Sequence, residues 1–469
     1  MISRLLSVTR DSVWASVMLV LLSAAGCGDP LPRVEGDFAF VGVDVLPMTE
    51  PGNPVVLENQ TVVVTNRRVA SINPADEVSV GESVVIVNAE GQYLMPGLAD
   101  MHGHLPSSRL MPVDRKNLLF LYVANGVTTL RVMQGSQSHF RLRDQISRGE
   151  ILGPRLFLGS PAMTGASVRT SEQGEQLVRE YHQNGYEQVK IHEGLTPEVF
   201  DAVASTAREV GIPFGGHVPD QVGLFDALVG GQMSIDHLDN YVEALVPDED
   251  QVGTLGFRRI GDSLDVINEE RLPSLVEATR MAGAWIVPTM AFWETVVWGV
   301  NSSSELRAMH QELRYIPPEI VGEWTRVVDE LQAVADPDTN RRVTELRRTV
   351  LKALYEGGVP ILLGTDSPET FDVPGFSIHH EMALLVELGM TPYHVLEAGT
   401  RRVAEYFDSV DDFGSVAVGQ RADFLLLTAD PIADVANVGE RAGVMVNGRW
   451  ISESQIQARL AGIAQFYGN

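Results

Sequence analysis

Short apolar runs alternate with helical patterns through the middle of the chain. Eight of these runs have the length of single strands, and most are followed by apolar residues at helical spacing, as in 196–210 and 268–281. Strands that are apolar on both faces and alternate with helices predict a parallel sheet covered by helices. Eight such units in about 300 residues favour a (β/α)8 TIM barrel. The eight runs lie at 94–104, 127–131, 155–159, 188–192, 212–217, 233–237, 284–288 and 360–366.

The segments on either side of this region have a different pattern. Residues 37–93 and 411–469 carry short β-type runs separated by turns rich in glycine and asparagine, which is typical of antiparallel strands. The stretch 452–466 predicts a helix. We therefore interpret 94–410 as the barrel domain and the two flanks as strand-rich regions outside it. The predicted flanking strands include 60–64, 84–87, 414–419, 422–427 and 444–448.

Polar side chains stand at the ends of the predicted barrel strands. His102 and His104 close the first strand, and side chains at positions i and i+2 of a strand point to the same side. Neutral imidazoles on one side can hold a divalent metal. The end of a TIM barrel at the strand C-termini carries the chemistry, and burying charged groups without partners is costly. The sequence therefore predicts a metal site from His102, His104, Lys190, His217, His237 and Asp366.

Four motifs around these residues resemble the amidohydrolase superfamily. They lie at 96–104, 216–219, 235–237 and 364–367. The lysine-bearing pattern is most similar to the group of imidazolonepropionase and Xaa-Pro dipeptidase. The resemblance implies a barrel whose two flanks pair into one small β-sandwich. In the two-metal members, strand four supplies a lysine carboxylated on its amine, and Lys190 stands at the matching position.

The resemblance also implies a role for each ligand. His102, His104 and Asp366 would bind the more buried of two divalent ions, most suitably zinc, and His217 and His237 would bind the second. An ammonium group has no lone pair, so a carboxylate derived from CO2 would let Lys190 bridge both ions. Paired metals activate a shared water, and Asp366 would act as general base and then as general acid.

We expect the protein to be a hydrolase of an amide-type C–N bond, acting on a small molecule or a short peptide such as a dipeptide. If Lys190 is instead an unmodified lysine paired with Glu187 or Glu193, a deaminase or cyclic-amide hydrolase with one metal is the better interpretation. A third hypothesis is an envelope-tethered binding protein without activity. The complete ligand set argues against it.

Three further residues are candidates for contact with substrate or for support of a ligand. His192 lies two positions past Lys190, and His379 follows the eighth predicted strand. Arg131 closes the second strand and could bind a substrate carboxylate or form a buried ion pair. Relatives commonly carry an acidic residue after this arginine, whereas this chain has Val132.

Other residues near the predicted rim have weaker signals. Residues 245–262 form an acidic, glycine-containing insertion that would be a lid or a solvated loop. The aromatic residues after the seventh strand would wall the pocket or simply pack; they are Phe292, Trp293 and Trp298. Four other histidines lie in polar or helical contexts and are expected at the surface. These are His139, His182, His310 and His394.

The N-terminus is typical of an export signal. Arg4 and Arg10 precede an apolar run at 13–22 and the small residues at 23–26. Cys27, the only cysteine, follows directly and resembles the lipidation site of a bacterial lipoprotein. We expect removal of 1–26, a tether at 27–36, and a protein that is lipid-anchored in the cell envelope or secreted.

Composition excludes some partners. The chain has 62 acidic and 35 basic residues, a net charge of −27, which argues against nucleic acid and against anionic lipid beyond the anchor. An apolar content of 44% over 469 residues supplies a core. We also consider assembly of the chain into a homo-oligomer.

Overall fold

The computed structural model describes residues 31–106, 113–247 and 260–468. The predicted signal segment, Cys27 and most of the insertion at 245–262 lie outside the described residues. Within those ranges, the structure contains no helix with the length and apolar character needed to cross a bilayer.

The central part of the chain is a mixed α/β unit with two parallel sheets. One has the strand order β10-β9-β8 and the other the order β11-β12-β13-β14. Seven of the eight predicted strands are thereby confirmed. Their bounds are β8 Leu98–Gly103, β9 Val127–Val132, β10 Arg155–Leu158, β11 Val189–Ile191, β12 Phe214–Gly216, β13 Ser234–Asp236 and β14 Trp285–Val287.

The prediction of an eighth strand at 360–366 is wrong. This segment makes one parallel bridge, between Ile361 and Ile286 of β14, and the amide of Met101 in β8 donates to the carbonyl of Leu363. Asp366 then takes a positive φ of 80°, which a regular strand excludes. Isolated bridges also join β10 to β11 at Gly159 and Gln188. The described strands therefore form two linked sheets rather than one closed sheet.

Helices connect most of these strands and cover their outer side. Helix α4 begins where Thr196 accepts a hydrogen bond from the amide of Val199 and ends at Gly211 with a φ of 77°, the usual signals for both ends. It confirms the helix predicted at 196–210, and α7 confirms most of 268–281. The remaining bounds are α1 Arg115–Ala124, α2 Gln137–Ser147, α3 Ser171–Asn184, α4 Pro197–Val210, α5 Gly223–Gly230, η1 Glu243–Leu245, η2 Ile260–Val266, η3 Glu269–Arg271 and α7 Leu272–Ala282.

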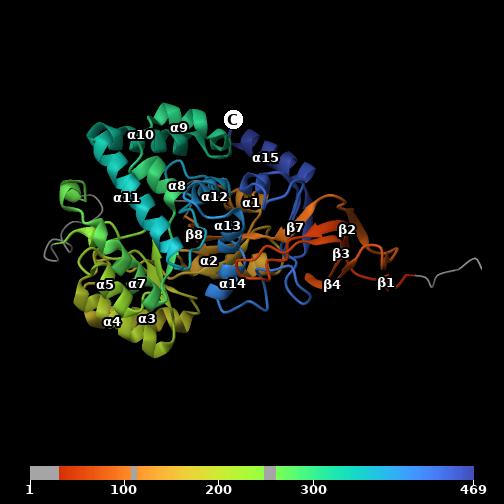
Figure 1. Cartoon of the computed structure of the whole chain (residues 1–469), viewed down its shortest axis with the longest axis horizontal. Helices are drawn as coiled ribbons and strands as arrows, with labels where there is room; N and C mark the ends of the chain where they lie inside the picture. The colour runs from red at the N-terminus through yellow and green to blue at the C-terminus, as the bar shows by residue number, and fades with distance from the viewer. Residues whose placement is uncertain (1–30, 107–112, 248–259, 469) are drawn as a thin grey trace, which may run out of the picture.

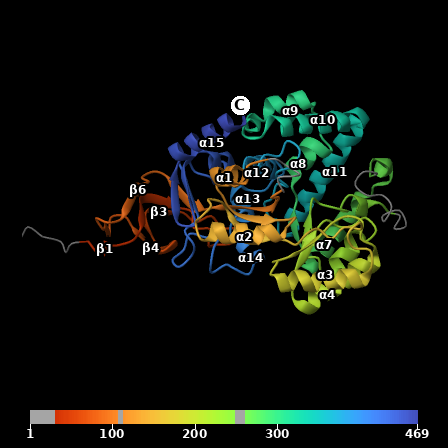
Figure 2. The ribbon, with the colours of Figure 1, turned by 180° about the vertical axis from the view of Figure 1, so that it is seen from behind.

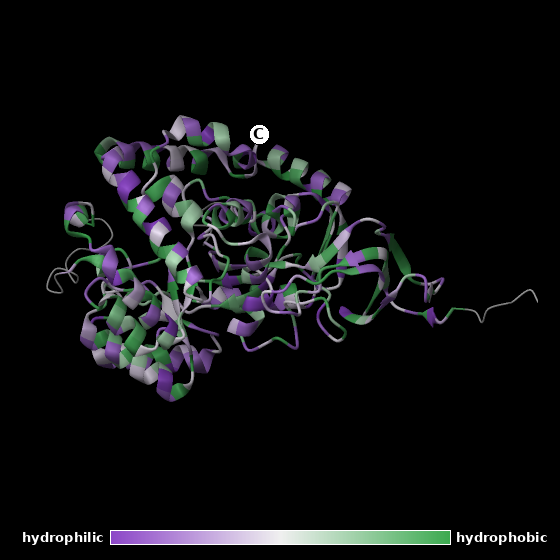
Figure 3. Ribbon diagram, in the orientation of Figure 1, coloured by the Kyte–Doolittle hydropathy of each residue, from purple (hydrophilic) through white to green (hydrophobic). Residues whose placement is uncertain are grey.

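A helical excursion (residues 290–356) follows β14 and was not predicted. It crosses the top of the molecule in Figure 1, and α11 then descends beside the strands. Along α10 and α11, polar and apolar positions alternate in the pattern of helices that bury one face (Figure 3). Its elements are α8 Met290–Phe292, η4 Trp293–Val297, α9 Ser303–Met309, η5 Gln311–Tyr315, α10 Pro318–Val334 and α11 Pro337–Glu356; α12 Ser377–Glu387, α13 Pro392–Ala398 and α14 Arg401–Tyr406 come later.

The two flanks of the chain share one sheet, at the end of the molecule opposite α3 and α4 (Figures 1 and 2). Its order is β17-β16-β15-β7-β2-β3-β4, and β6 pairs with β2. Strand β15 lies antiparallel to β7, with Leu425 opposite Met95. The bounds are β2 Phe38–Val45, β3 Leu57–Thr65, β4 Arg68–Pro74, β6 Val85–Asn88, β7 Tyr93–Pro96, β15 Phe424–Leu427, β16 Arg441–Val446 and β17 Arg449–Ser452.

This sheet confirms that the flanks come together, and it corrects two details. Residues 414–419 form turns rather than the predicted strand, and a second large sheet that would complete a sandwich is not found in the described parts of these flanks. The only other sheet there is the pair of β1 Arg33–Val34 and β5 Ser79–Val80. Helix α15 Glu453–Tyr467 confirms the predicted C-terminal helix, and η6 Val435–Gly439 precedes β16.

Candidate metal centre

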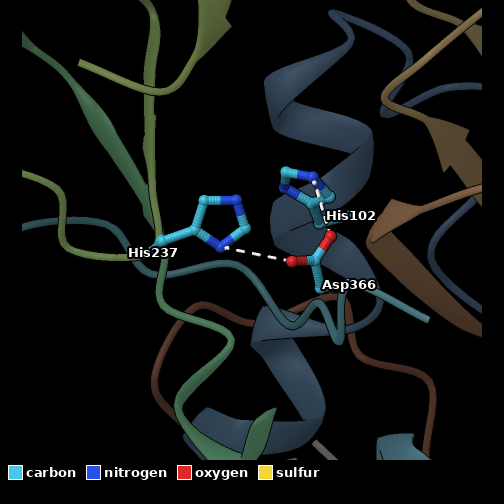
Figure 4. A group of neighbouring side chains, drawn as sticks. All are labelled: His102, His237 and Asp366. Atoms are coloured by element: carbon cyan, nitrogen blue, oxygen red, sulfur yellow. Dashed lines mark ion pairs between the residues drawn. The ribbon is translucent and has the colours of Figure 1, made fainter. Parts of the chain in front are cut away.

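The structure brings all six predicted ligand residues together at the C-terminal ends of the parallel strands. His102 lies in β8 and Lys190 in β11, whereas His217 and His237 directly follow β12 and β13. One candidate ligand atom from each of His102, His237 and Asp366 lies within 4.8 Å of the other two. Figure 4 shows these three side chains facing one another.

Asp366 lies at the centre of this group. Its Oδ1 is 2.8 Å from Nε2 of His104 and 3.3 Å from Nε2 of His102. Its Oδ2 is 3.8 Å from Nδ1 of His237 (Figure 4). The ring of His237 lies 4.4 Å from that of His102 and 4.5 Å from that of His217. His237 therefore connects the ligands on the two sides of the site.

Two of the histidines have their Nδ1 atom held by a hydrogen bond, and a third has an oxygen close to it. Nδ1 of His217 lies 2.8 Å from Oδ2 of Asp239. Nδ1 of His102 lies 2.8 Å from Oδ2 of Asp236, although it makes no hydrogen bond within the described residues. Nδ1 of His237 lies 2.7 Å from Oγ1 of Thr289.

This arrangement fixes ring orientation and leaves Nε2 available as a ligand. Nε2 of His237 is buried and has no hydrogen-bond partner in the described parts of the chain. A divalent cation would satisfy such an atom, so the donor set fits a metal.

The backbone at two of these residues is in the left-handed region. φ is 63° at His237 and 80° at Asp366. A non-glycine residue in this region costs free energy, which is tolerated mainly at functional sites. Each residue follows directly after a buried segment, so the turn aims its side chain back over the strand ends.

Lys190 is buried and contacts the histidines. Its Nζ lies 3.4 Å from Nε2 of His102. Burial lowers the pKa of Lys190, although Asp236 and Asp366 oppose the shift. The pairing with glutamate that we considered is not observed. Glu187 accepts hydrogen bonds from Arg143 and the amide of Leu158.

Glu193 also has another partner, because it accepts a hydrogen bond from the amide of Asp220. Lys190 is therefore an amine without a carboxylate in hydrogen-bond contact among the described residues. Such a group is poorly explained as a structural ion pair.

Burial controls the protonation of the site. It lowers the pKa of His217 and of His192 to about 3, and it lowers that of His102 well below its usual value. These histidines are neutral near pH 7, as metal ligands must be. Burial also raises the pKa of Glu193 and of Asp239 to about 8. A cation bound at His217 would favour the ionised form of both carboxyls.

The site opens into a cavity of about 880 Å³. The metal-site residues form its polar side, and the helical excursion forms an apolar wall. Of the two alternatives for the aromatic residues, the structure has the pocket wall. Carboxyl groups of Glu193 and Glu369 also line it. The apolar wall includes Phe292, Trp293, Val296, Trp298, Val327 and Leu331.

The three weaker candidates differ in whether they line the cavity. His192 lines the cavity, and its ring lies 4.3 Å from that of His217. Arg131 is not a lining residue; its guanidinium is buried and donates to both carboxylate oxygens of Asp236, at 3.0 and 3.2 Å. Of the two alternatives for Arg131, the structure therefore has the buried ion pair, and this arginine supports the carboxylate that lies beside His102.

His379 is also not a lining residue. Its Nε2 lies 3.3 Å from Oδ1 of Asn125. Among the four histidines expected at the surface, His182 is exposed and His394 is half-buried, but His139 and His310 are buried. The last two positions were predicted wrongly because a polar local sequence does not reveal which helix face packs inward.

Several supporting residues were missed. Asp236 and Asp239 lie within two positions of His237, so a search for carboxylates beside ligand histidines would have found them. Asp100 accepts hydrogen bonds from the amides of His102 and Thr365, and burial raises its pKa to about 7. Thr289 carries no local signal, because its role depends on the packing of β14 against β13.

Comparisons with known proteins agree with this geometry. Imidazolonepropionase of Alkaliphilus oremlandii is 21% identical over 394 residues, which cover 80% of this chain and 85% of the relative. The solved structure of a bottromycin amidohydrolase matches with a TM-score of 0.70 at 22% identity and covers 92% and 90% of the two chains.

A Xaa-Pro dipeptidase structure with bound methionine matches with a TM-score of 0.63 at 17% identity, over 88% of this chain and 99% of the other. At such identities the structural likeness concerns the fold. The model of the Amidohydrolase family matches residues 93–451, a range that contains every strand of the parallel sheets and all six candidate ligands. The chain therefore belongs to the amidohydrolase family.

Proposed function

We propose that this protein is a metal-dependent hydrolase that cleaves an amide-type C–N bond in a small molecule or short peptide. One observation carries the proposal: ring nitrogens of His102, His104 and His237 lie 2.8–3.8 Å from the carboxylate of Asp366, and the ring of His217 packs against that of His237. Burying these polar groups costs free energy unless a cation binds to them, and the bound cation would have its ligands already in place.

We infer that the site holds two divalent ions, with zinc the best match to imidazole and carboxylate ligands. His102, His104 and Asp366 would hold one, and His217 and His237 the other. Because the ring of His237 lies almost equally far from those of His102 and His217, it is placed to complete either group.

Lys190 would be the bridging ligand once carboxylated. The reaction joins a neutral amine to CO2 and gives a carbamate and a proton. Burial favours the neutral amine that this reaction requires. Nζ is 3.4 Å from His102 Nε2, so a carboxylate added there would lie among the ligand atoms.

The bound cations would polarise the substrate carbonyl and acidify water at the site. The carboxylate of Asp366 would take the proton from the attacking water and deliver it to the leaving nitrogen. His104 lies 2.8 Å from Oδ1 of Asp366 and would hold that carboxylate in place. The apolar wall of the cavity would exclude bulk water and bind the less polar part of the substrate.

A one-metal site is the second candidate, and one observation favours it. Ligand atoms of His102, His237 and Asp366 already lie within 4.8 Å of one another while Lys190 is an amine. If Lys190 stays unmodified, this group would serve a deaminase or a cyclic-amide hydrolase.

The location of the protein is also a proposal. We infer export and lipid attachment at Cys27, followed by an extended tether, because an apolar segment and small residues precede this single cysteine. We further infer that the linked parallel sheets act as a barrel of the TIM type, with the composite domain of both flanks beside it.

Metal analysis and activity assays test the proposed function together. The wild type should retain two equivalents at this site and hydrolyse members of a panel of dipeptides, N-acyl amino acids and cyclic amides. Lys190→Ala should lose at least one equivalent and the activity. Full metal content and activity in this variant would contradict the bridging role, and a metal-loaded wild type inactive on the whole panel would revive the binding-protein hypothesis.

A further inference from the structure

A second cluster of metal-ligand side chains lies outside the cavity. His310 follows α9, Glu312 is in η5, and His380 is in α12. One candidate ligand atom from each lies within 4.8 Å of the other two. We refer to these three residues as the His310 cluster.

The distances in the His310 cluster suit a small cation. Nδ1 of His310 lies 2.9 Å from Oε1 of Glu312, and Nε2 of His380 lies 3.7 Å from the same oxygen. Zinc bonds of about 2.0–2.1 Å in tetrahedral geometry place neighbouring ligand atoms about 3.3–3.4 Å apart. The two distances to Glu312 each differ from this value by a few tenths of an ångström, and the ligand atoms of the two histidines lie within 4.8 Å of each other.

Hydrogen bonding alone explains this cluster incompletely. At 3.7 Å, His380 is too far from Glu312 for a hydrogen bond.

The surroundings allow an ion to enter and stay. The side chain of His380 is 44% exposed, whereas that of Glu312 is 9% exposed. The cluster therefore has one face open to water.

We propose that His310, Glu312 and His380 form a zinc site that is separate from the candidate metal centre, with water in the fourth position. Two histidines and one glutamate are a common ligand set for zinc. The ion would join the helical excursion, which walls the cavity, to α12. This site does not depend on the proposed hydrolase activity.

Equilibrium dialysis of the full chain against buffered free zinc tests this site. We expect one equivalent per chain to bind at least tenfold more weakly in His380→Gln and in Glu312→Gln than in the wild type. His380 is partly exposed and glutamine can keep the hydrogen bond of Glu312, so both variants should fold, as circular dichroism would verify. His182→Gln removes another exposed histidine and should bind zinc as the wild type does.

The rise in melting temperature caused by zinc gives a second readout. It should be smaller in His380→Gln than in the wild type and in His182→Gln. Equal zinc isotherms for His380→Gln and the wild type would overturn the proposal, and so would an equal loss in His182→Gln. Loss of zinc from His217→Gln alone would concern the candidate metal centre and not this cluster.

Discussion

The candidate metal centre and the His310 cluster use the same kinds of side chain with different degrees of support. In the centre, Asp239 and Thr289 hydrogen-bond the Nδ1 atoms of His217 and His237, and Asp236 lies 2.8 Å from Nδ1 of His102. In the His310 cluster, Glu312 is both the partner of the histidine and a candidate ligand. The centre is therefore preorganised by a surrounding layer, and we expect it to bind metal more tightly.

The support at the centre extends one layer further. Arg131 pairs with Asp236, which in turn lies 2.8 Å from His102. Arg131 also donates to Ser234 and Tyr406. Among the described residues, no comparable chain of contacts supports His380, whose side chain is 44% exposed.

Asp366→Asn should lower kcat by about 10²–10⁴-fold, because asparagine cannot accept and return the proton. Steady-state kinetics on the best substrate of the panel would measure it. The matched control is Glu369→Gln, which changes another carboxyl of the cavity and should keep kcat within about tenfold of wild type. Equal losses in both variants would mean that Asp366 has no special role.

Arg131→Met should lower the free energy of unfolding by about 3–5 kcal/mol, because it leaves Asp236 buried and unpaired. Urea unfolding would measure the loss. Arg131→Met combined with Asp236→Leu should recover part of that stability, since the unpaired charge is removed. A single variant as stable as the wild type, with only a raised KM, would instead support the substrate contact that the structure disfavours.

Thr289→Val should weaken metal binding at the centre about 10–100-fold, because His237 loses the group that orients its ring. Competition with a chelator would measure the affinity. Thr279 is also a buried threonine, hydrogen-bonded to Tyr241. Thr279→Val should therefore cost stability and leave metal affinity unchanged; a similar loss of affinity in the two variants would argue against a local effect on His237.

Asp372 belongs to neither cluster and gives a prediction about stability alone. Burial raises its pKa well above the usual value, and its Oδ2 is buried without a hydrogen-bond partner in the described residues. The folded state therefore keeps a proton that the unfolded state releases above about pH 4. This carboxyl makes the free energy of unfolding fall as the pH rises from there towards the raised pKa, by up to about 1.4 kcal/mol per pH unit.

Asp372→Asn should remove that part of the pH dependence. Urea unfolding at several values between pH 5 and 8 would show a shallower decline for this variant than for the wild type. Asp338 is exposed at the start of α11, so Asp338→Asn should retain the decline of the wild type. Parallel curves for all three proteins would show that Asp372 titrates normally.

Local pattern predicted much of the fold and the centre. Alternating apolar runs located seven parallel strands, and the strand ends identified six side chains that meet in space. Local pattern failed where tertiary contacts decide. The segment before Asp366 bonds to β8 and β14 without forming a regular strand, and the helical excursion has no counterpart in the repeated strand–helix pattern.

The same limit explains the errors in single residues. His310 and His139 have polar neighbours in sequence, yet both are buried by elements distant in the chain. For Arg131 the sequence allowed both a substrate contact and a buried ion pair. The choice depends on contacts with Asp236 and with Tyr406, which is 275 positions away, and no local pattern contains that information.

Anomalous diffraction at the zinc edge, from crystals of the zinc-loaded full chain, tests directly whether these side chains form a zinc centre. We expect strong anomalous peaks among His102, His217, His237 and Asp366, together with density for a carboxylate on Nζ of Lys190. Zinc-loaded crystals without an anomalous peak among these side chains would contradict the proposed metal centre.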